Sequence, residues 1–288
     1  MGNNFIDKLK KKSNKNLTVK PVYLNSEDYR VALDYLKTQN FIKFNKIKNI
    51  LNINFLDSEP FGNILINEKK EIVGFLGTIF AKRRHQNNDL PHCYLHTWIV
   101  NKKHRLQTFR LLLPIIERKI FVSTFSPIKS LVGLYEKLGF KKKIFYSRLI
   151  LITPSIERKK SNNVLYTNNK DCEKFLSDYD LKIFRDHSNN EVYNLCYVDV
   201  EKNEYTYLIA KKNYKKKIIP VVEILFISNE HNYLKNIKQI NLHLLKKFKT
   251  FFIIKNCVKY ESSFFYKNMY YLNVPKDFNL DLLYSELC

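Results

Sequence analysis

The sequence predicts an α/β protein in which helices pack on mixed sheets, with one order of strands and helices used twice along the chain. Three observations support this fold class. Residues 131–138 place apolar side chains at helical spacing, and Gly139 follows where a left-handed residue would end the helix. Short apolar runs upstream alternate with glycines and charged turns, as in a meander of strands. A similar order of elements recurs after residue 163. We therefore expect two α/β domains.

The first half opens with a predicted strand near residues 17–24, and helical sequence follows from residue 27 to about residue 51. Two apolar runs, at residues 62–66 and 72–80, flank the charged turn 68–71. This pattern predicts a hairpin.

The third strand of the meander is predicted at residues 93–100, where side chains alternate between two faces. The expected faces are Tyr94, His96 and Trp98 on one side, and Leu95, Thr97 and Ile99 on the other.

The remaining elements of the first half alternate between helix and strand. A basic loop at residues 101–105 precedes apolar helical spacing at 111–116 and a short strand at 120–124. The helix of residues 131–138 and a last strand near 144–152 complete the order.

Residues 17–152 resemble the GNAT superfamily of acyl-CoA-dependent N-acyltransferases. The most specific match is Leu134-Tyr135-Glu136-Lys137-Leu138-Gly139-Phe140, which is similar to the motif in the second half of that family's acyl-CoA site. Residues 74–77 resemble the central meander, and residues 97–100 with 103–105 resemble the strand and loop that carry the cofactor. The resemblance implies a GNAT-like fold, acetyl-CoA or another acyl-CoA as co-substrate, and a primary amine as acceptor.

The chemistry of acyl transfer assigns roles to these residues. An amine attacks the thioester, an oxyanion forms, and the leaving thiolate takes a proton from an acid. The resemblance implies that this acid is Tyr135, although core packing alone would also explain a tyrosine there. We prefer His96 as general base, because its strand passes the expected thioester position. The resemblance also implies a set of cofactor-binding residues: Thr97, Trp98, Ile99 and Val100 along the pantetheine, and Arg105, Thr108 and Arg110 at the pyrophosphate.

Other residues that border the expected acceptor side are weaker candidates for the general base. They are His92, Asp57 and Glu59, each of which is more often an ordinary surface or strand residue.

The pyrophosphate loop departs from the family pattern. Arg105 fits it, but Thr108 and Arg110 stand where the family has small residues that let the backbone approach phosphate. Pro114 lacks an N–H group, so we expect the following helix to start late or to kink. Arg110 would either add charge to the phosphate site or fill it.

One branch of the superfamily, associated with bacterial surface polysaccharides, also lacks these glycines. It carries a serine or threonine near the position of Thr108 and a turn similar to residues 124–127. This resemblance implies an amino-sugar intermediate as the acceptor.

The second half follows a polar linker at residues 153–163 and forms a domain over residues 164–288. We interpret it as a degenerate GNAT-like copy, because it has no counterpart of residues 134–140, with an unrelated α+β domain as the alternative. Its predicted elements are a helix at 171–185, strands at 191–200, 204–211 and 218–227, a helix at 231–248 and a strand at 250–254.

Composition limits the class of protein. With 45% hydrophobic and 14% aromatic residues, the chain can bury a core. No apolar run approaches the length of a membrane span, and residues 1–16 read as a basic flexible terminus without a secretory signal. The 5 cysteines lack metal-ligand spacing and suit reduced thiols. We therefore expect a cytoplasmic protein without a metal.

The net charge of +23 supports an alternative function as a nucleic-acid-binding protein. Lysine runs at residues 10–12, 141–143 and 215–217 are interleaved with aromatic residues that could stack on bases. The excess is spread along the chain, however, and an AT-rich genome would produce it without selection for binding. A solvated surface is the simpler interpretation, and a non-catalytic GNAT-like binding module is the other alternative to an enzyme.

Overall fold

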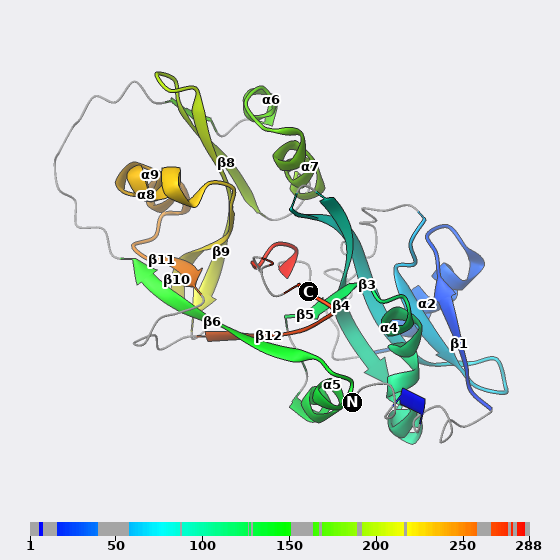
Figure 1. Ribbon diagram of the computed structural model, residues 1–288. Helices are drawn as coiled ribbons and strands as arrows, with labels where there is room; N and C mark the ends of the chain where they lie inside the picture. Colours follow the sequence, from blue (N-terminus) through cyan, green and yellow to red (C-terminus); the bar gives the residue numbers. More distant parts are fainter. Residues whose placement is uncertain are drawn as a thin grey trace. The chain divides into compact units, whose positions relative to one another are not determined.

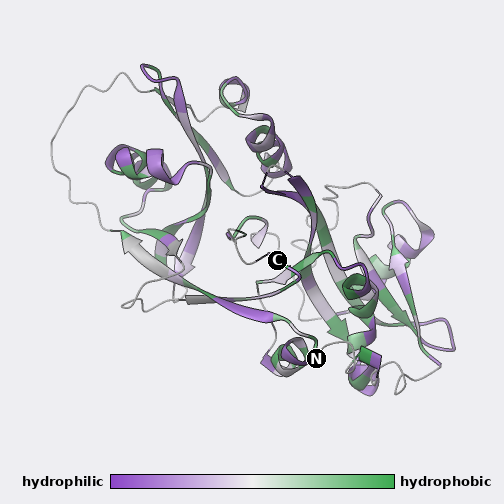
Figure 2. Ribbon diagram, viewed as in Figure 1, coloured by the Kyte–Doolittle hydropathy of each residue, from purple (hydrophilic) through white to green (hydrophobic). Residues whose placement is uncertain are grey.

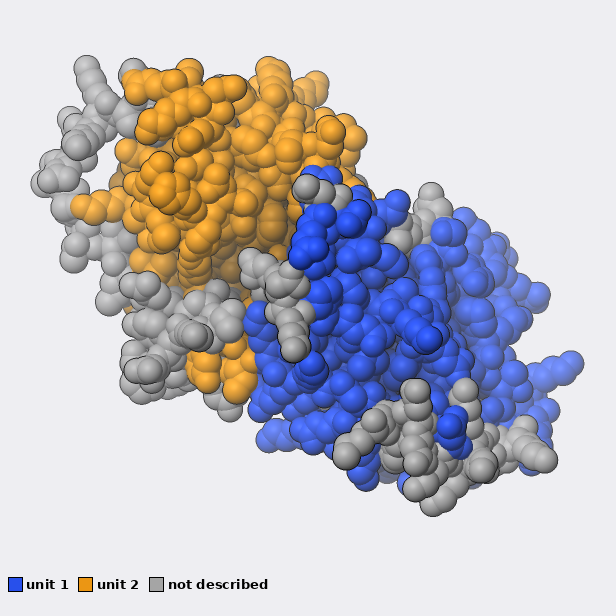
Figure 3. Space-filling view, viewed as in Figure 1, with its two compact units in different colours: residues 1–143, 268–279, 287–288 blue, residues 144–267, 280–286 orange. Residues whose placement is uncertain are grey.

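The structure is a computed structural model that divides into two compact units, coloured in Figure 3. Unit 1 comprises residues 1–143, 268–279 and 287–288, and unit 2 comprises residues 144–267 and 280–286. The residues described are 6–7, 16–39, 58–86, 88–125, 127, 129–150, 164–166, 169–188, 192–215, 218–257, 266–275, 278 and 281–285.

Unit 1 is a sheet in the order β1-β2-β3-β4-β5-β12, with helices between its strands (Figure 1). Neighbouring strands are antiparallel except β4 and β5, which run parallel. Its elements in chain order are β1 (Thr18–Val22), α2 (Glu27–Lys37), β2 (Gly62–Ile66), β3 (Ile72–His85), β4 (Asn88–Val100), the 3₁₀ helix η1 (Lys102–Leu111), α4 (Leu113–Glu117), β5 (Phe121–Thr124), the 3₁₀ helix η2 (Lys129–Leu131), α5 (Val132–Lys137) and, from the end of the chain, β12 (Tyr266–Leu272).

Two hydrophobic clusters cover the two faces of this sheet. On one face α4 and α5 pack against β3 and β4 through residues that include Leu76, Leu95 and Tyr135. On the other face α2 packs through Ala32 and Leu36. The hydrophobic colour along α4 in Figure 2 reflects its burial. The central strands β3 and β4 are therefore buried from both sides.

Local sequence explains the ends of α5 and α4. Gly139 adopts a φ of 90°, which ends the α5 segment and directs the chain into the next strand, as the sequence predicts. Pro114 lies in the first turn of α4, so that helix starts only after η1 has ended, as expected from its missing N–H.

Unit 2 repeats this order of elements. Its sheet has the order β6-β11-β10-β9-β8-β7, in which β10 and β11 are the parallel pair. Its elements are β6 (Lys141–Ile150), β7 (Val164–Tyr166), α6 (Asn169–Glu173), α7 (Asp178–His187), β8 (Tyr193–Asp199), β9 (Glu204–Lys215), β10 (Ile219–Ile227), α8 (Glu230–Lys235), α9 (Ile237–Phe248) and β11 (Ile253–Cys257).

The last strand of each half of the sequence completes the sheet of the other unit. Strand β6 follows α5 in the chain but pairs with β11, in a register that joins Ile150 to Ile253. Strand β12 follows β11 but pairs with β5, joining Tyr270 to Thr124. The division at residues 153–163 expected from the sequence does not anticipate this exchange, because strand pairing over such distances leaves no local signal.

Some element bounds differ from those expected. The helix expected at residues 171–185 is two helices, α6 and α7, and the helix expected at 231–248 is α8 and α9. The short strands β7 and β12 were not expected, and residues 40–57, 151–163 and most of 1–15 lie outside the described part. Among the helices described, none is long and apolar enough to cross a membrane.

Candidate functional site

Strands β4 and β5 separate at the centre of unit 1. Their parallel pairing begins at His92 with Phe121 and ends at Tyr94 with Ser123. Strand β4 continues for six residues, up to Val100, and in the described part of the chain no strand pairs with this stretch on the β5 side. The backbone groups along this edge are therefore available to a ligand that offers amides.

A β-bulge lies in this part of β4. Trp98 pairs with Leu76 and His96 pairs with Gly77, which leaves Thr97 without an opposing residue on β3. Thr97 has a φ of 43°, an unusual conformation for a β-branched residue. The bulge shifts the alternation of side chains, so the expected common face for Tyr94, His96 and Trp98 is wrong.

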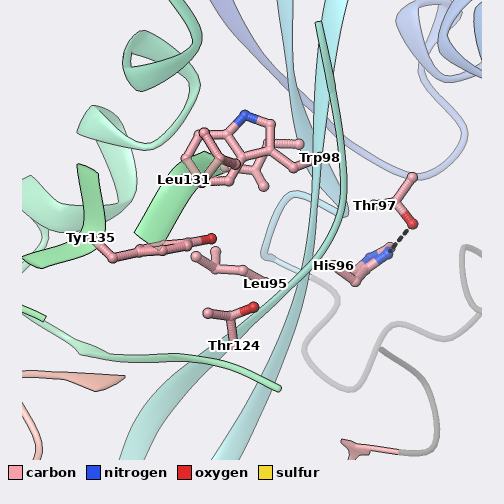
Figure 4. Close-up of a pocket in the computed structure, with 8 residues that line it drawn as sticks. Leu95, His96, Thr97, Trp98, Thr124, Leu131 and Tyr135 are labelled. Atoms are coloured by element: carbon pink, nitrogen blue, oxygen red, sulfur yellow. Dashed lines mark hydrogen bonds between the residues drawn. The ribbon is translucent and has the colours of Figure 1, made fainter. Parts of the chain in front are cut away.

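Figure 4 shows the consequence for the side chains at this point. Trp98 lies on the same side of β4 as Tyr135, whereas His96 and Thr97 lie on the opposite side. Ile99 packs on the α2 side, so its side chain does not reach the cavity.

The space between the separated strands is a cavity of about 40 Å³. One water molecule needs about 10–15 Å³ of such space, so the cavity is small but exceeds the room for a single water. Residues 95–98 of β4 line it together with Leu76, Thr124, Leu131 and Tyr135. Four residues singled out from the sequence, Tyr135, His96, Thr97 and Trp98, thus line one cavity.

Tyr135 is 2% exposed and enters this cavity from α5. Its ring packs edge-on against Trp98 at 5.7 Å and against Phe140 at 4.9 Å, and stacks on Tyr270 at 5.8 Å between centroids. Burial raises the pKa of Tyr135 above its usual value, although a hydrogen bond with the side chain of Thr124 opposes the shift. The hydroxyl therefore keeps its proton near neutral pH and can act as an acid but not as a base.

His96 fills the space above Gly77. A Cβ atom at Gly77 would lie 2.3 Å from Cε1 and 2.5 Å from Nε2 of the imidazole, so only glycine fits there. The Nδ1 atom of His96 shares a hydrogen bond of 3.0 Å with Oγ1 of Thr97. Burial lowers the pKa of His96 to about 4, so the ring is neutral near pH 7 and is a weaker base than a free imidazole.

The Nε1 atom of Trp98 is a buried donor that makes no hydrogen bond within the described part of the chain. Buried N–H groups are nearly always paired in proteins. Trp98 lines the cavity, but in Figure 4 its indole nitrogen lies on the side of the ring away from the Tyr135 hydroxyl. A ligand carbonyl oxygen that reaches this nitrogen could accept its hydrogen bond.

The segment that carries Arg105, Thr108 and Arg110 is the 3₁₀ helix η1, where the sequence predicts a loop over residues 101–105. The N–H group of His104 is used inside this helix, where it donates to the carbonyl of Asn101 at 2.8 Å. None of the three side chains lines the cavity. Arg105 is exposed, whereas burial lowers the pKa of the half-buried Arg110.

The start of α4 offers few backbone donors. Pro114 has no N–H group, and the N–H groups of Ile115 and Ile116 both donate to the carbonyl of Leu112. The expected binding of pyrophosphate by Arg105, Thr108 and Arg110 stays a prediction, and it would have to depend on their side chains.

The other residues considered as bases lie elsewhere. His92 is buried and hydrogen-bonded to Oγ of Ser123, and burial beside Arg83 holds its pKa well below the usual value. Glu59 forms a bidentate ion pair with Arg118 at 2.5 Å. Asp57 lies outside the described residues.

Sequence reasoning missed two residues that matter to this geometry. The sequence places Thr124 in a short strand and a turn without a role in the site, yet its side chain is the hydrogen-bond partner of Tyr135. Gly77 belongs to the segment that resembles the family's central meander, and a glycine inside a strand is a known signal for close approach of another group.

No group of three or more His, Cys, Asp or Glu residues that could hold a metal ion occurs among the described residues. The candidate site consists of the cavity between β4 and β5, the protonated hydroxyl of Tyr135 and the neutral imidazole of His96.

Comparisons with known proteins agree with this architecture. No protein-family model matches the chain, and no curated protein matches it by sequence. Among solved structures, a GCN5-related N-acetyltransferase from Kribbella flavida is similar with a TM-score of 0.59 and 10% identity, over 90% of this chain and 71% of that one. A GCN5-related N-acetyltransferase from Anabaena variabilis ATCC 29413 gives a TM-score of 0.58 at 10% identity, over 88% and 72%.

A third similar structure comes from Enterococcus faecalis V583 and is described as a conserved protein of unknown function, probable N-acyltransferase. It has a TM-score of 0.55 and 9% identity, over 88% of this chain and 71% of that one. At these identities the likeness concerns the fold. The GNAT-like fold expected from residues 17–152 is confirmed: the chain has the fold of the GCN5-related N-acetyltransferases.

Proposed function

We propose that the protein is an acyl-CoA-dependent N-acyltransferase that acts at the cavity between β4 and β5. The observation that carries the proposal is the meeting of a proton-bearing Tyr135, an unpaired Trp98 donor and a free strand edge at one cavity. A thioester requires these three features: amide partners for the pantetheine arm, a donor for its carbonyl and an acid for its sulfur.

In the proposed reaction the amine attacks the thioester carbon from the His96 side of β4. The N–C bond forms, His96 accepts the proton that the nitrogen loses, and the oxyanion takes hydrogen bonds from nearby N–H donors. Thr97 supplies a backbone N–H outside the β3 ladder, because the bulge leaves it without a partner there. The C–S bond then breaks, and Tyr135 protonates the thiolate. Proton exchange with solvent returns both side chains to their starting states.

The size of the cavity favours a short acyl group such as acetyl. A space of about 40 Å³ beside Leu76, Leu95, Leu131 and two aromatic rings fits a short acyl group more readily than a long one. The acceptor that we propose is an amino sugar, on the strength of the turn at residues 124–127 and of Thr108.

The single tryptophan of the chain allows a direct test. Emission excited at 295 nm reports on Trp98 alone, so acetyl-CoA that fills the cavity should change it saturably at micromolar concentrations. Free N-acetyltryptophanamide titrated with the same acetyl-CoA is the control for adenine absorption, and the Trp98→Phe variant confirms that the emission comes from Trp98. Thiol release should follow when a panel of amines, including glucosamine phosphates, is added with acetyl-CoA.

Two outcomes would favour the alternatives. A saturable change in Trp98 emission without thiol release for any amine would support a non-catalytic binding module. Absence of both, with DNA binding that falls steeply with salt, would instead support polyanion binding through the net charge of +23.

A further inference from the structure

A second, larger hollow lies in unit 1 at the end of β4, next to the turn between β2 and β3. Its volume is about 530 Å³, which is within the range of sites for nucleotide-sized ligands. The side chains that give it its character are Lys69, Glu71, Asn101, Lys102, Lys103 and His104.

The net charge of this hollow is positive, because three lysines line it with one glutamate. Within the described part of the chain, Lys69, Lys102 and Lys103 make no ion pair and no side-chain hydrogen bond. The one acid, Glu71, is engaged with Asn67, whose Nδ2 atom donates to it at 2.8 Å. The three lysines outnumber the single carboxylate, and the resulting net positive charge attracts an anion.

Asn101 adds a neutral donor to the hollow. Its Oδ1 atom accepts a hydrogen bond of 3.1 Å from the hydroxyl of Tyr35, which leaves its amide N–H groups for another acceptor. Oxygen atoms of phosphate accept hydrogen bonds from both amide and ammonium donors.

The location relates the hollow to the proposed reaction. Trp98 lines the cavity and Asn101 lines the hollow, three residues apart on one chain. At about 3.3 Å per residue this separation is about 10 Å. The free edge of β4 faces the β5 side and the hollow adjoins the β2–β3 turn, so a ligand along that edge reaches the hollow only by crossing the end of β4 at Asn101. The start of α4 offers phosphate little by comparison, because its first N–H groups are absent or already bonded.

We propose that the hollow binds the phosphate groups of acyl-CoA through Lys69, Lys102 and Lys103, in place of a backbone cradle at the start of α4. This inference rests on the acyl transfer proposed above. In this arrangement charged side chains recognise the phosphates. One of them, Lys69, lies in the turn between β2 and β3, which the sequence alone does not connect with the cofactor.

The experiment compares charge-removing variants with a control that changes the net charge equally. Lys102→Gln with Lys103→Gln removes two cations from the hollow, and Lys69→Gln removes one from a different segment. Lys141→Gln with Lys142→Gln removes two exposed cations of β6 that lie outside the hollow. Each protein is titrated with acetyl-CoA, with S-acetyl-pantetheine, which has no phosphate, and with adenosine 3′,5′-bisphosphate.

We expect acetyl-CoA binding to weaken about tenfold in the Lys102 and Lys103 double variant and about threefold in Lys69→Gln, at moderate salt. The Lys141 and Lys142 control should bind as the parent does. S-acetyl-pantetheine should bind all variants equally, and adenosine 3′,5′-bisphosphate should compete with acetyl-CoA in the parent protein. Unfolding temperatures of the variants should be the same, because the replaced lysines are exposed.

Three results would overturn the inference. Equal weakening in the Lys141 and Lys142 control would assign the effect to the overall field of the protein. Unchanged acetyl-CoA affinity in both the Lys102 and Lys103 double variant and Lys69→Gln would show that these lysines do not bind phosphate. Failure of adenosine 3′,5′-bisphosphate to compete with acetyl-CoA would lead to the same conclusion. If S-acetyl-pantetheine still binds and is turned over in those cases, only this inference fails. If neither thioester binds, the proposed acyl transfer fails as well.

Discussion

Replacing Gly77 by alanine tests the arrangement of His96 directly. The new Cβ atom would meet three atoms of the imidazole at 2.3 to 2.7 Å, whereas ordinary contacts start near 3.4 Å. The ring therefore has to move by about 1 Å, and it is 5% exposed, so the surrounding side chains resist the movement.

The expected loss of stability follows from this overlap. Insertion of a methyl group into a packed interior typically costs about 1–3 kcal/mol, and contact at this distance places Gly77→Ala in the upper part of that range. For a unit of this size, about 2 kcal/mol corresponds to a decrease of roughly 4–8 °C in melting temperature. The acceptor side of the site is disturbed, but Trp98 and Tyr135 lie on the opposite side of β4. We therefore expect slower amine acetylation with acetyl-CoA affinity within about twofold of the parent.

A double-mutant cycle measures the contact by urea unfolding of four proteins. In a His96→Ala background the space above Gly77 is empty, so Gly77→Ala should cost almost nothing, and the coupling energy should be about 2 kcal/mol. Gly133→Ala is the matched control. A Cβ atom at Gly133 would have no neighbour within 4 Å, and alanine should stabilise α5 by about 0.5–1 kcal/mol. Equal costs of Gly77→Ala in both backgrounds would show that the imidazole does not occupy this space.

Four further predictions concern the acid, the bulge, the base and the exchanged strand. Tyr135→Phe should leave acetyl-CoA binding intact and reduce thiol release about 10²-fold, and unchanged turnover would exclude the acid role. Thr97→Gly should relieve strain and raise unfolding stability by about 1 kcal/mol while it slows turnover, and a loss of stability would argue against the left-handed conformation. The folded-state pKa of His96 is about 4, so as the pH falls the unfolded chain takes up the proton before the folded protein does. The free energy of unfolding should therefore decrease by about 3 kcal/mol from pH 6.5 to pH 4. His96→Gln should abolish this part of the pH dependence. Residues 1–152 alone lack β12 and should aggregate, whereas fusion to residues 266–279 by a flexible linker should restore a folded unit; a soluble, cooperatively folding 1–152 fragment would contradict this.

Local signals in the sequence were sufficient for much of unit 1. The helix at residues 131–138 and its stop at Gly139 depend on spacing and on one glycine, and the structure has both. The late start of α4 follows from Pro114, which acts on its own turn. Features of this kind are predictable because each depends on a few neighbouring residues.

The bulge at Thr97 had no such signal. A threonine in a run of apolar residues fits a regular strand, and only the pairing with Leu76 and Gly77 reveals the extra residue. For the same reason the sequence placed His96 and Trp98 on one face. The exchange of β6 and β12 was equally hidden, because it depends on pairing between segments more than a hundred residues apart.

The exchange changes the interpretation of the second half of the chain. Tyr270 of β12 stacks on Tyr135 at 5.8 Å, and β12 covers the edge of β5 that would otherwise be open. The environment of the proposed acid thus includes a residue from the far end of the sequence. A second half that had lost its own catalytic residues would still be retained under this arrangement, because its last strand completes the unit that carries the candidate site.

The bulge also gives the proposed reaction its direction. In a regular strand His96 and Trp98 would share a face, since they are two residues apart. The extra residue at Thr97 separates them, so the imidazole faces one side of β4 while Trp98 and the Tyr135 hydroxyl face the other. An amine that loses its proton on the first side attacks a thioester whose sulfur leaves on the second. One inserted residue therefore places the proposed base, His96, and the proposed acid, Tyr135, on opposite sides of a single strand. The two proton transfers of the proposed reaction would then take place on different sides of β4.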